Sequence, residues 1–396
     1  MKIMSVVGAR PNFIKIAPFI RAIEDCNQKR ESDIRLKNIL VHTGQHYDDK
    51  MSRMFFSNLD ISEPDINLGI GSGSHAEQVG RTMMAFEQIV RSVRPDWIVV
   101  VGDVNAACAC SITAKKENVS LAHIEAGLRS YDMTMPEEVN RIVADRLSDL
   151  LFTPDPLSGD NLRSEGVAEE KIYCVGNIMI DTLEAQRKKV ESLNIFQIIE
   201  QNIMPGSRGM HDERGTAPLA DRPYILVTMH RPSNVDDPEI LASVLDFLMN
   251  EAARDMPVLW PVHPRTVKRM KDFDLWEGVL GCSNLILMGP LGYLEFLRLN
   301  MQSKLMLTDS GGLQEECCVL GTPCLTLRWN TERPVTLKKY GGTCTLVGND
   351  LQQIREAYYE ALKTERRPAR PHLWDGKTAG RIVQAIRKQC KNQMSP

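Results

Sequence analysis

Short apolar runs alternate with longer segments of helical periodicity over the first part of the chain. The apolar runs have the length and the Val/Ile/Leu content of buried strands. These predicted strands are Met1–Val7, Asn38–His42, Asp96–Val101, Leu121–Ile124 and Leu150–Phe152. The helices predicted between them are Ile14–Asn27, Ala76–Val93, Ala106–Glu117 and Glu137–Ser148. This alternation of strand and helix predicts a doubly wound parallel sheet.

The same alternation restarts after residues 202–222, a segment of low apolar content that we expect to be an exposed loop. The strands predicted beyond it are Tyr224–Met229, Val258–Pro261, Leu285–Leu287, Leu305–Thr308 and Pro323–Thr326. The helices predicted there are Pro238–Ala253, Leu291–Met301 and Leu313–Leu320. We therefore predict two α/β domains, 1–175 and 176–376, and expect the amphipathic segment 377–391 to pack back on the first.

The composition, with 43% hydrophobic and 25% charged residues, is that of an ordinary soluble globular protein. A formal net charge of −3 gives no electrostatic basis for binding nucleic acid or an anionic membrane, so neither is an expected partner. The N-terminus becomes polar at Gly8, and no apolar run long enough for a membrane span follows. The ten cysteines form no C-x-x-C pair, which is typical of reduced thiols in a cytoplasmic protein without a metal site.

Two glycine-containing loops follow predicted strands, where ligands bind in open α/β sheets. Gly8 permits close backbone approach and Arg10 is a planar cation suited to phosphate, although a solvated turn would have the same sequence. The second loop, Ser310-Gly311-Gly312, opens a helix whose first amides could bind an anion, although a serine there is usually an N-cap. Neither a G-x-x-x-x-G-K-[ST] loop nor a G-x-G-x-x-G fingerprint is present, so neither ATP-driven phosphoryl transfer nor tightly bound NAD is supported.

Carboxylates follow two strands of the first domain. Asp103 comes after the strand ending at Val101, and Glu125 follows the next strand within a stretch that otherwise reads as buried. A buried carboxylate is costly unless it is paired, so Glu125 is either functional or held by a structural partner such as Arg129.

A third acid begins a predicted helix. Glu137 and Arg141 lie four residues apart and so share one helical face, which would suit proton transfer beside a fixed cation. The alternative is structural, because Thr134 and Glu137 fit the S/T-x-x-E capping box.

Histidine–arginine pairs follow two strands of the second domain. His230-Arg231 ends one strand and His263 follows the next, while Arg333 adds a cation later in the domain. A lone histidine at a strand end is more often structural, but two such clusters favour a diphosphate site. Acids on one domain and cations on the other indicate proton exchange at a group whose diphosphate leaves or returns.

The motifs GARPNFIKIAP, VHTGQHYD, HIEAGLRS, MPEEVNR, TMHR, VHPRT, LTDSGGLQEE and TERP occur in this order along the chain. In these motifs and their order the chain resembles the non-hydrolysing UDP-N-acetylglucosamine 2-epimerases. The resemblance implies the GT-B fold, with two Rossmann-like doubly wound domains and an active site in the cleft between them. It also implies a cytoplasmic homodimer that converts UDP-N-acetylglucosamine to UDP-N-acetylmannosamine without a cofactor, by elimination of UDP and re-addition to 2-acetamidoglucal.

The resemblance assigns roles to two groups of residues. The catalytic residues that it implies are Asp103, Glu125, Glu137, Arg141 and His230. The UDP-sugar-binding residues that it implies are Arg10, Lys15, Gln45, His46, Arg231, His263, Ser310, Gly311, Gly312, Glu316 and Arg333.

Other activities remain open at this stage. The stretch GSGSHAEQVGRTM also resembles relatives that epimerise UDP-2,3-diacetamido-2,3-dideoxyglucuronate, and a hydrolysing enzyme would release free N-acetylmannosamine. A GT-B glycosyltransferase or a non-catalytic nucleotide-sugar sensor would share the fold. The acids Asp103, Glu125 and Glu137 favour epimerisation, because a transferase needs at most one base.

Overall fold

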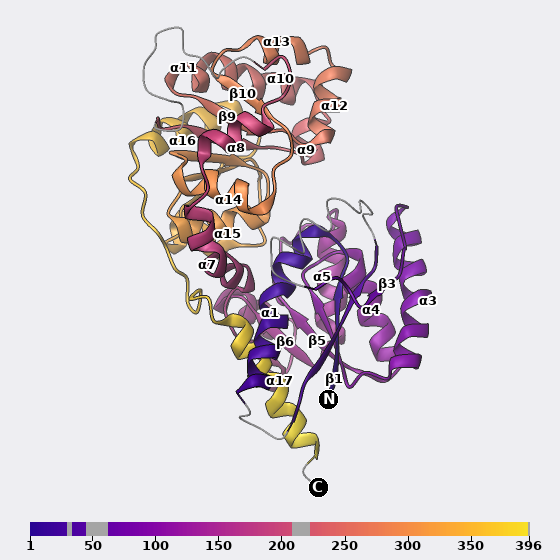
Figure 1. The fold of residues 1–396 in the computed structure, drawn as a ribbon. Helices are drawn as coiled ribbons and strands as arrows, with labels where there is room; N and C mark the ends of the chain where they lie inside the picture. The colour runs from indigo at the N-terminus through magenta and orange to yellow at the C-terminus, as the bar shows by residue number, and fades with distance from the viewer. Residues whose placement is uncertain (30–33, 45–61, 208–221, 395–396) are drawn as a thin grey trace. The chain divides into compact units, whose positions relative to one another are not determined.

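The computed structural model describes residues 1–29, 34–44, 62–207 and 222–394. The chain forms two compact units, Met1–Ala185 with His372–Pro396, and Gln186–Pro371. Each unit has a parallel sheet with helices packed against it (Figure 1). This arrangement confirms the predicted two-domain α/β fold.

In the described part of the first unit, seven parallel strands follow the order β3-β2-β1-β4-β5-β6-β7. They are β1 (Lys2–Val7), β2 (Lys37–His42), β3 (Ile66–Asn67), β4 (Trp97–Val101), β5 (Ser120–Ile124), β6 (Leu150–Thr153) and β7 (Ile172–Cys174). The helices are α1 (Arg10–Gln28), α3 (His75–Val93), α4 (Asn105–Lys116), α5 (Pro136–Leu147), α6 (Pro156–Ser164), a 3-10 turn (Glu169–Lys171), α7 (Ile178–Glu191) and α17 (Thr378–Met394). Helix α7 runs across the boundary into the second unit.

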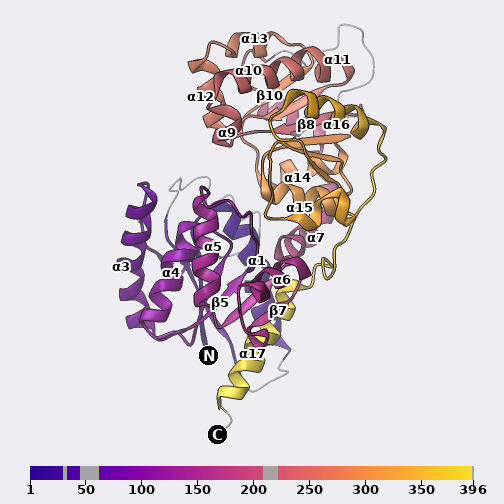
Figure 2. The same cartoon turned by 180° about the vertical axis from the view of Figure 1, so that it is seen from behind.

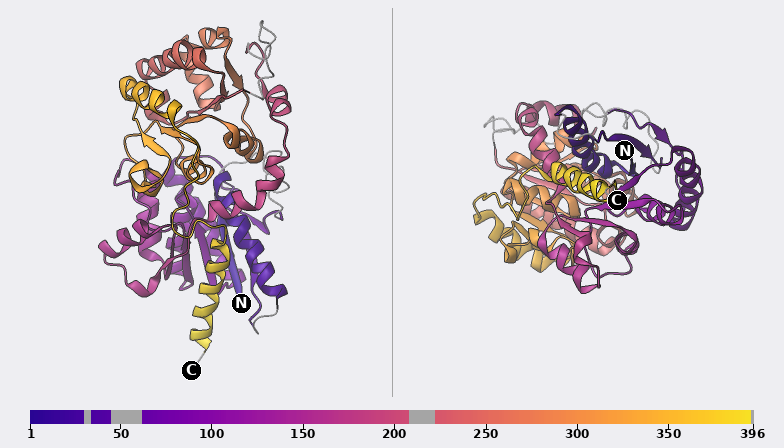
Figure 3. Two further views of the ribbon diagram at one scale, coloured as in Figure 1. Left: turned by 90° about the vertical axis from the view of Figure 1, so that its left-hand side faces the viewer. Right: turned by 90° about the horizontal axis from the view of Figure 1, so that it is seen from below.

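Helices of the first unit pack in two groups. Helix α3 contacts α4, and α4 contacts α5; Figures 1 and 2 show α3 and α4 side by side. Helix α17, which covers the predicted segment 377–391, contacts α1; Figure 3 shows the yellow α17 beside the indigo α1 in both views. Right-handed crossovers explain the two groups, because the strand order reverses between β1 and β4.

A parallel sheet covered on both faces needs strands that are apolar throughout, and all five residues of β4 are buried. On one face Ile98 and Val100 pack with Phe86 and Val90 of α3 in one cluster. Val100 is also the register partner of Val6 in β1, so the central pair of strands is buried in the core.

The unit boundary lies beyond the predicted residue 175 because the start of α7 is fixed within the first unit. The Asp181 carboxylate accepts a hydrogen bond from the backbone N–H of Thr378 (3.0 Å), and Thr182 donates to a carbonyl of α1 (2.6 Å). The second unit also ends before the predicted residue 376, since the Trp374 indole donates to the Pro154 carbonyl of the first unit (2.9 Å).

In the described part of the second unit, six parallel strands follow the order β10-β9-β8-β11-β12-β13. They are β8 (Ile225–Thr228), β9 (Val258–Pro261), β10 (Leu285–Met288), β11 (Leu305–Thr308), β12 (Cys324–Thr326) and β13 (Cys344–Leu346). The helices are α8 (Ile195–Asn202), α9 (Pro232–Val235), α10 (Pro238–Phe247), a π-helical segment (Leu248–Ala252), α11 (Ala253–Asp255), α12 (Pro264–Asp272), α13 (Trp276–Gly281), α14 (Tyr293–Gln302), α15 (Gly311–Leu320) and α16 (Leu351–Lys363), with 3-10 turns at Pro334–Thr336 and Lys338–Tyr340. Of the predicted loop 202–222, residues 208–221 lie outside the described residues.

Successive residues of β8 enter different cores, as expected for a strand covered on both faces. Ile225 and Val227 belong to one hydrophobic cluster, and Leu226 belongs to the other. The described cysteines are free thiols, and those buried in this unit include Cys317, whose pKa is raised by burial. In the described ranges of the chain, no helix combines the length and the apolar character needed to cross a membrane.

Candidate functional site

The order of the strands reverses between β1 and β4 in the first unit and between β8 and β11 in the second. Ligands of open α/β sheets bind at the carboxyl ends of the strands flanking such a switch point. The Gly8 loop and Asp103 follow the two strands of the first switch point, while His230 and Ser310 follow those of the second. The predicted residues therefore lie where each sheet is suited to bind a ligand.

The side chain of Asn12 holds the loop after β1 against the end of β4. Its Oδ1 accepts hydrogen bonds from the backbone N–H groups of Gly8 and Ala9 (both 3.0 Å), and its Nδ2 donates to the Val101 carbonyl (3.0 Å). Asn12 was not predicted as a site residue, although it stands within the motif GARPNF. The Arg10 side chain, Gln45 and His46 lie outside the description.

Glu125, directly after β5, is ion-paired with Lys15 of α1, and both side chains are buried. Its backbone has φ = +74°, a conformation that is costly for a residue with a Cβ. Arg129 is not its partner: that guanidinium pairs with Asp145 and with Glu165, each at 2.7 Å. The structure therefore uses Lys15 to compensate the buried charge of Glu125.

Gly102 brings this ion pair close to the backbone that carries Asp103. It has φ = +68°, and a Cβ there would lie 3.1 Å from Glu125 Oε2 and 3.2 Å from Lys15 Nζ. The Asp103 carbonyl accepts a hydrogen bond from the Asn140 amide (2.8 Å). The two acids Asp103 and Glu125 and the cation Lys15 are thus brought together at one end of the sheet.

The capping box predicted at the start of α5 is not formed. The N-cap position is Met135, which offers no capping side chain, and the helix begins at Pro136. Thr134 Oγ1 instead donates to Asp132 Oδ1 (2.6 Å), because the helix starts one residue later than the box requires. Glu137 is therefore not held by that motif and lies half-buried in the first turn of the helix.

Arg141 is a fully buried cation on α5, with a side chain that is 1% exposed. Its Nη1 lies 3.7 Å from Asp103 Oδ2, and its Nε lies 3.3 Å from Glu138 Oε2. The acid paired with it on the helix is therefore Glu138, three residues before it, rather than the predicted Glu137. Glu138 also accepts a hydrogen bond from the backbone N–H of Tyr131 (2.9 Å), so it fixes both Arg141 and the preceding loop.

In the second unit, Asp309 orients the histidine at the end of β8. Its Oδ2 accepts from the backbone N–H groups of His230 (2.9 Å) and Arg231 (2.7 Å), and its Oδ1 lies 3.1 Å from His230 Nδ1. Burial opposes ionisation of Asp309, yet the hydrogen bond from His230 holds its pKa below the usual range. The imidazole is therefore fixed at Nδ1 by an anion. Asp309 was not predicted as a site residue, although an acid directly after an apolar strand is a signal for one.

His263 packs beside His230, with ring centroids 5.2 Å apart. It stands at the N-cap of α12, where its Nδ1 accepts a hydrogen bond from the Arg265 N–H (3.1 Å). Burial and the neighbouring His230 lower the pKa of His263. His263 is thus a neutral ring near pH 7, with its proton on Nε2.

The start of α15 has the features of an anion site. Ser310 occupies the N-cap position, but its side chain makes no capping hydrogen bond. A Cβ on Gly311 would lie 2.5 Å from Glu332 Oε1, so packing alone requires a glycine there. A Cβ on Gly312 would meet nothing within 4 Å, so this second glycine leaves open space beside the helix amides.

Arg333 and Glu316 are buried behind this loop. Arg333 Nε lies 2.8 Å from Glu315 Oε1, and its Nη1 pairs with Glu332, so its charge is compensated by two acids of the unit. Burial and the charge of Glu315 raise the pKa of Glu316 to about 8. Glu316 is therefore protonated at neutral pH and could donate a hydrogen bond.

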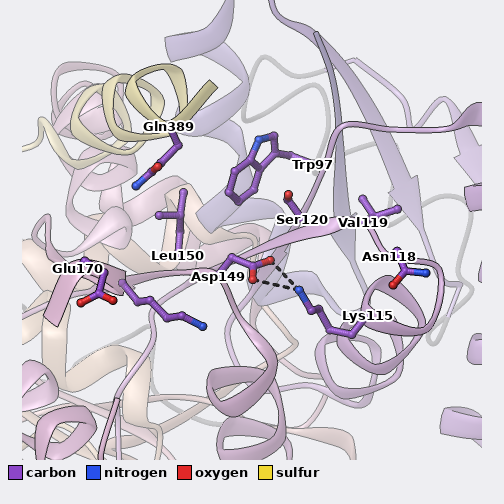
Figure 4. A pocket seen from close by; sticks show the side chains of 10 residues that line it. Trp97, Lys115, Asn118, Val119, Ser120, Asp149, Leu150, Glu170 and Gln389 are labelled. Atoms are coloured by element: carbon purple, nitrogen blue, oxygen red, sulfur yellow. Dashed lines mark hydrogen bonds and ion pairs between the residues drawn. The ribbon is translucent and has the colours of Figure 1, made fainter. Parts of the chain in front are cut away.

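A hollow of about 350 Å³ lies at the amino ends of the strands of the first sheet (Figure 4). Its lining includes Trp97, Ser120 and Leu150, each at the start of a strand, and the ion pair between Lys115 and Asp149 (2.9 Å). Asp103 and Glu125 lie at the carboxyl ends of the strands, so this hollow is separate from the candidate site.

Comparisons with known proteins identify the family of the chain. The family model described as UDP-N-acetylglucosamine 2-epimerase matches residues 28–387. The enzyme of that name from Methanocaldococcus jannaschii is 38% identical over 387 residues, 98% of this chain and 99% of the relative. The crystal structure of the UDP-GlcNAc 2-epimerase from that organism, in complex with UDP-GlcNAc and UDP, has a TM-score of 0.85, with 36% identity over 98% of this chain and 100% of that one.

A relative with another named substrate matches less of the chain. The UDP-2,3-diacetamido-2,3-dideoxy-D-glucuronate 2-epimerase of Pseudomonas aeruginosa is 37% identical over 339 residues, 84% of each chain. The matched ranges contain the acids of the first unit and the cations of the second, and the two parallel sheets have the GT-B architecture. The chain belongs to the UDP-N-acetylglucosamine 2-epimerase family.

Proposed function

We propose that this protein interconverts UDP-N-acetylglucosamine and UDP-N-acetylmannosamine by inverting carbon 2 of the sugar. The observation that carries the proposal is Glu125: a buried carboxylate at φ = +74°, paired with Lys15 and lying beside the Gly102-Asp103 backbone. Such a group is costly to fold, and costly arrangements of this kind are concentrated at functional sites. Membership of the epimerase family supplies the reaction type.

The proposed reaction is an elimination followed by an addition. A base removes the proton from C2, the C1–O bond breaks with its electron pair going to UDP, and 2-acetamidoglucal remains. UDP then re-adds through its oxygen to C1, while an acid delivers a proton to the opposite face of C2. The net change is inversion at C2, and no oxidant or reductant is needed.

The first unit supplies the proton-transfer groups in this proposal. Asp103, Glu125 and Glu137 are the acid and base candidates, and each such group typically contributes about 10²–10⁴-fold to the rate. Lys15 forms an ion pair with Glu125, and the buried Arg141 places positive charge near Asp103.

The second unit binds the diphosphate in this proposal. The first amides of α15, beginning at Gly311 and with open space at Gly312, receive the anion. His230, fixed by Asp309, stabilises the charge that develops when the C1–O bond breaks. The roles of Arg10, Gln45, His46 and Arg231 in UDP-sugar binding stay predictions from the sequence.

Proton NMR of the purified protein with UDP-N-acetylglucosamine in D₂O, without cofactor or acceptor, tests the function. We expect UDP-N-acetylmannosamine to appear with deuterium at C2, since the incoming proton comes from solvent-exchanged acids. Product without deuterium would refute the elimination, and an unchanged spectrum would refute this substrate.

Two variants test the acid–base roles against a matched control. Glu125→Gln and Glu137→Gln should each lower kcat by about 10²–10⁴-fold while the Kd for UDP changes little. Glu117→Gln, which alters an ion pair with Arg91 on the surface of the same unit, should keep full activity. Equal rates in all three variants would remove the assignment.

Three alternatives are distinguished by their substrate, their products or their need for an acceptor. The Pseudomonas relative and the stretch GSGSHAEQVGRTM favour UDP-2,3-diacetamido-2,3-dideoxyglucuronate as the second candidate substrate, tested in the same NMR assay. Free N-acetylmannosamine with UDP would instead identify a hydrolysing enzyme. A glycosyltransferase would turn over only with an acceptor present.

We also propose that the protein acts as a cytoplasmic homodimer without a bound cofactor. The support is the family, together with free thiols throughout the described cysteines. Sedimentation equilibrium measures the subunit number, and a monomer at working concentration would contradict the dimer.

A further inference from the structure

A chain of buried charges lies behind the acids of the first unit, and the proton transfers described above do not use it. His123, the residue before the last in β5, is 0% exposed, and its partner Asp145 on α5 is 2% exposed. An ionisable pair inside an otherwise apolar sheet is costly, so its presence calls for a physical explanation.

Both nitrogens of the His123 ring face hydrogen-bond acceptors. Nδ1 lies 2.7 Å from Asp145 Oδ1, and Nε2 lies 2.9 Å from the carbonyl oxygen of Gly102. A carbonyl oxygen accepts and cannot donate, and a neutral imidazole has one N–H. Both contacts are hydrogen bonds only if the ring carries both protons, or if Asp145 carries one.

The surroundings of Asp145 favour the first arrangement. Its Oδ2 accepts from Arg129 Nη1 (2.7 Å) and from the backbone N–H of Gly127 (3.1 Å), and both bonds favour the ionised carboxylate. Burial opposes the charge on Asp145, but His123 and Arg129 hold its pKa below the usual range. Burial likewise opposes the charge on His123, but the carboxylate of Asp145 raises its pKa. The pair is therefore an imidazolium and a carboxylate.

The ring acts on the backbone that carries Asp103. The Gly102 carbonyl bound by His123 belongs to the peptide that joins Gly102 to Asp103, and the Gly102 N–H donates to the Ile124 carbonyl (3.0 Å). Gly102 has φ = +68°, and the ring N–H holds the carbonyl that follows this turn of the backbone. The direction in which Asp103 leaves the sheet depends on that peptide.

The other charged groups near the ring make a consistent set. Glu125 follows His123 by two residues and raises its pKa further, while Lys15 of α1 neutralises Glu125. Arg129 compensates Asp145 from the loop after β5. Positive and negative groups alternate from Lys15 through Glu125, His123 and Asp145 to Arg129. The imidazolium therefore also places a fixed positive charge close to Asp103 and Glu125.

We propose that His123 is a permanently charged positioning residue, locked by Asp145, that sets the orientation of Asp103 through the Gly102 carbonyl. It contacts no substrate and transfers no proton; it acts through the Gly102–Asp103 peptide. The catalytic consequence rests on the proposed epimerase function, whereas the charge of the ring does not.

The charge is tested first, by ¹⁵N NMR of histidine-labelled protein between pH 6 and pH 9. We expect the ring of His123 to show two protonated nitrogens throughout this range, identified by its loss in His123→Gln or its shift in Asp145→Asn. An unprotonated nitrogen at pH 7 in the wild-type protein would overturn the proposal. This measurement needs no activity, so its outcome is independent of whether the protein is an epimerase.

The positioning is tested by kinetics with a matched control. Asp145→Asn should lower kcat by about 10²-fold with little change in KM, since misplacing a catalytic group by about 1 Å costs that much. In Asp145→Asn the ring of His123 can lose a proton, so the activity of this variant should also fall as pH rises. The activity of the wild type should not fall over the same range. Asp149→Asn, which alters the half-exposed ion pair with Lys115, should change neither kcat nor the histidine spectrum. Wild-type kcat in Asp145→Asn would overturn the positioning, and an inactive wild type would instead overturn the epimerase proposal.

Discussion

Replacing Lys15 by methionine is the most direct perturbation of the acid cluster, because it removes the cation and keeps the apolar stem of the side chain. The side chains of Lys15 and Glu125 are 8% and 4% exposed. Removing one member of a buried ion pair typically costs about 3–5 kcal/mol, since the other charge is left in an environment of low dielectric.

Protonation of Glu125 limits this cost and makes it depend on pH. Taking up a proton costs about 1.4 kcal/mol for each pH unit above the ordinary glutamate value of about 4.3. The destabilisation caused by Lys15→Met is therefore limited to about 4 kcal/mol at pH 7 and about 1 kcal/mol at pH 5. A carboxyl that binds its proton more tightly when folded loses stability as pH rises, so Lys15→Met should be increasingly destabilised between pH 5 and pH 7.

Urea unfolding of both proteins at several pH values measures the difference. Lys115→Met is the matched control, because its ion pair with Asp149 is 35% exposed on each side and should contribute about 0.2–1 kcal/mol at most. The double variant Lys15→Met with Glu125→Gln should recover most of the loss and remove its pH dependence. A pH-independent loss equal in Lys15→Met and Lys115→Met would refute the burial argument.

Four further substitutions separate binding, stability and catalysis in the second unit. Gly312→Ala should raise the Kd for UDP and leave the Tm unchanged, whereas Gly311→Ala should lower the Tm, because its Cβ would lie 2.5 Å from a buried carboxylate; equal Tm changes would contradict this. Glu316→Gln should become more stable relative to wild type as pH rises from 4.5 to about 8, since the raised pKa of the wild-type carboxyl disfavours its ionisation; a difference that stays flat in calorimetry would show that the carboxyl is already ionised. Asp309→Asn should lower kcat more than it raises KM, because His230 loses the anion at its Nδ1; a change confined to KM would assign Asp309 to binding.

The sequence predicted the long buried strands because they carry their own signal. The runs at Val258–Pro261 and Leu305–Thr308 match the observed strands in full, since a strand buried on both faces is apolar throughout. The strands β3, β7 and β13 were not predicted. Each has two or three residues and mixed exposure, as at Ile66–Asn67, so neither length nor alternation distinguishes it from a loop.

The candidate residues were predicted more readily than their partners. Position after a strand identified Asp103 and Glu125, because the carboxyl ends of parallel strands form the ligand-binding edge. The partner of Glu125 was sought nearby at Arg129, but it is Lys15, which is 110 residues away in sequence. Pairings of that separation depend on the packing of α1 against the sheet, and a single sequence contains no pattern for them.

Local motifs gave the least reliable interpretation. Thr134 and Glu137 have the spacing of a capping box, yet the loop before α5 is fixed by the next residue of the helix, Glu138, which binds the backbone of Tyr131. A signal for the buried pair existed in His123, an ionisable residue within an apolar strand, but its partner Asp145 lies on another element. A local contact thus replaced the predicted capping box, whereas the packing of α5 against β5 gave His123 its partner.

The return of residues 372–394 to the first unit has a consequence for biosynthesis. The second unit is one continuous segment, Gln186–Pro371, and its strands and helices all leave the ribosome before α17 does. The first unit, although its sheet is translated before the second unit, lacks the helix that covers α1 until the second unit has been translated. Domains fold as they emerge at about 5–20 residues per second. The sheet of the first unit is therefore made before the second unit, but the unit is completed only after it.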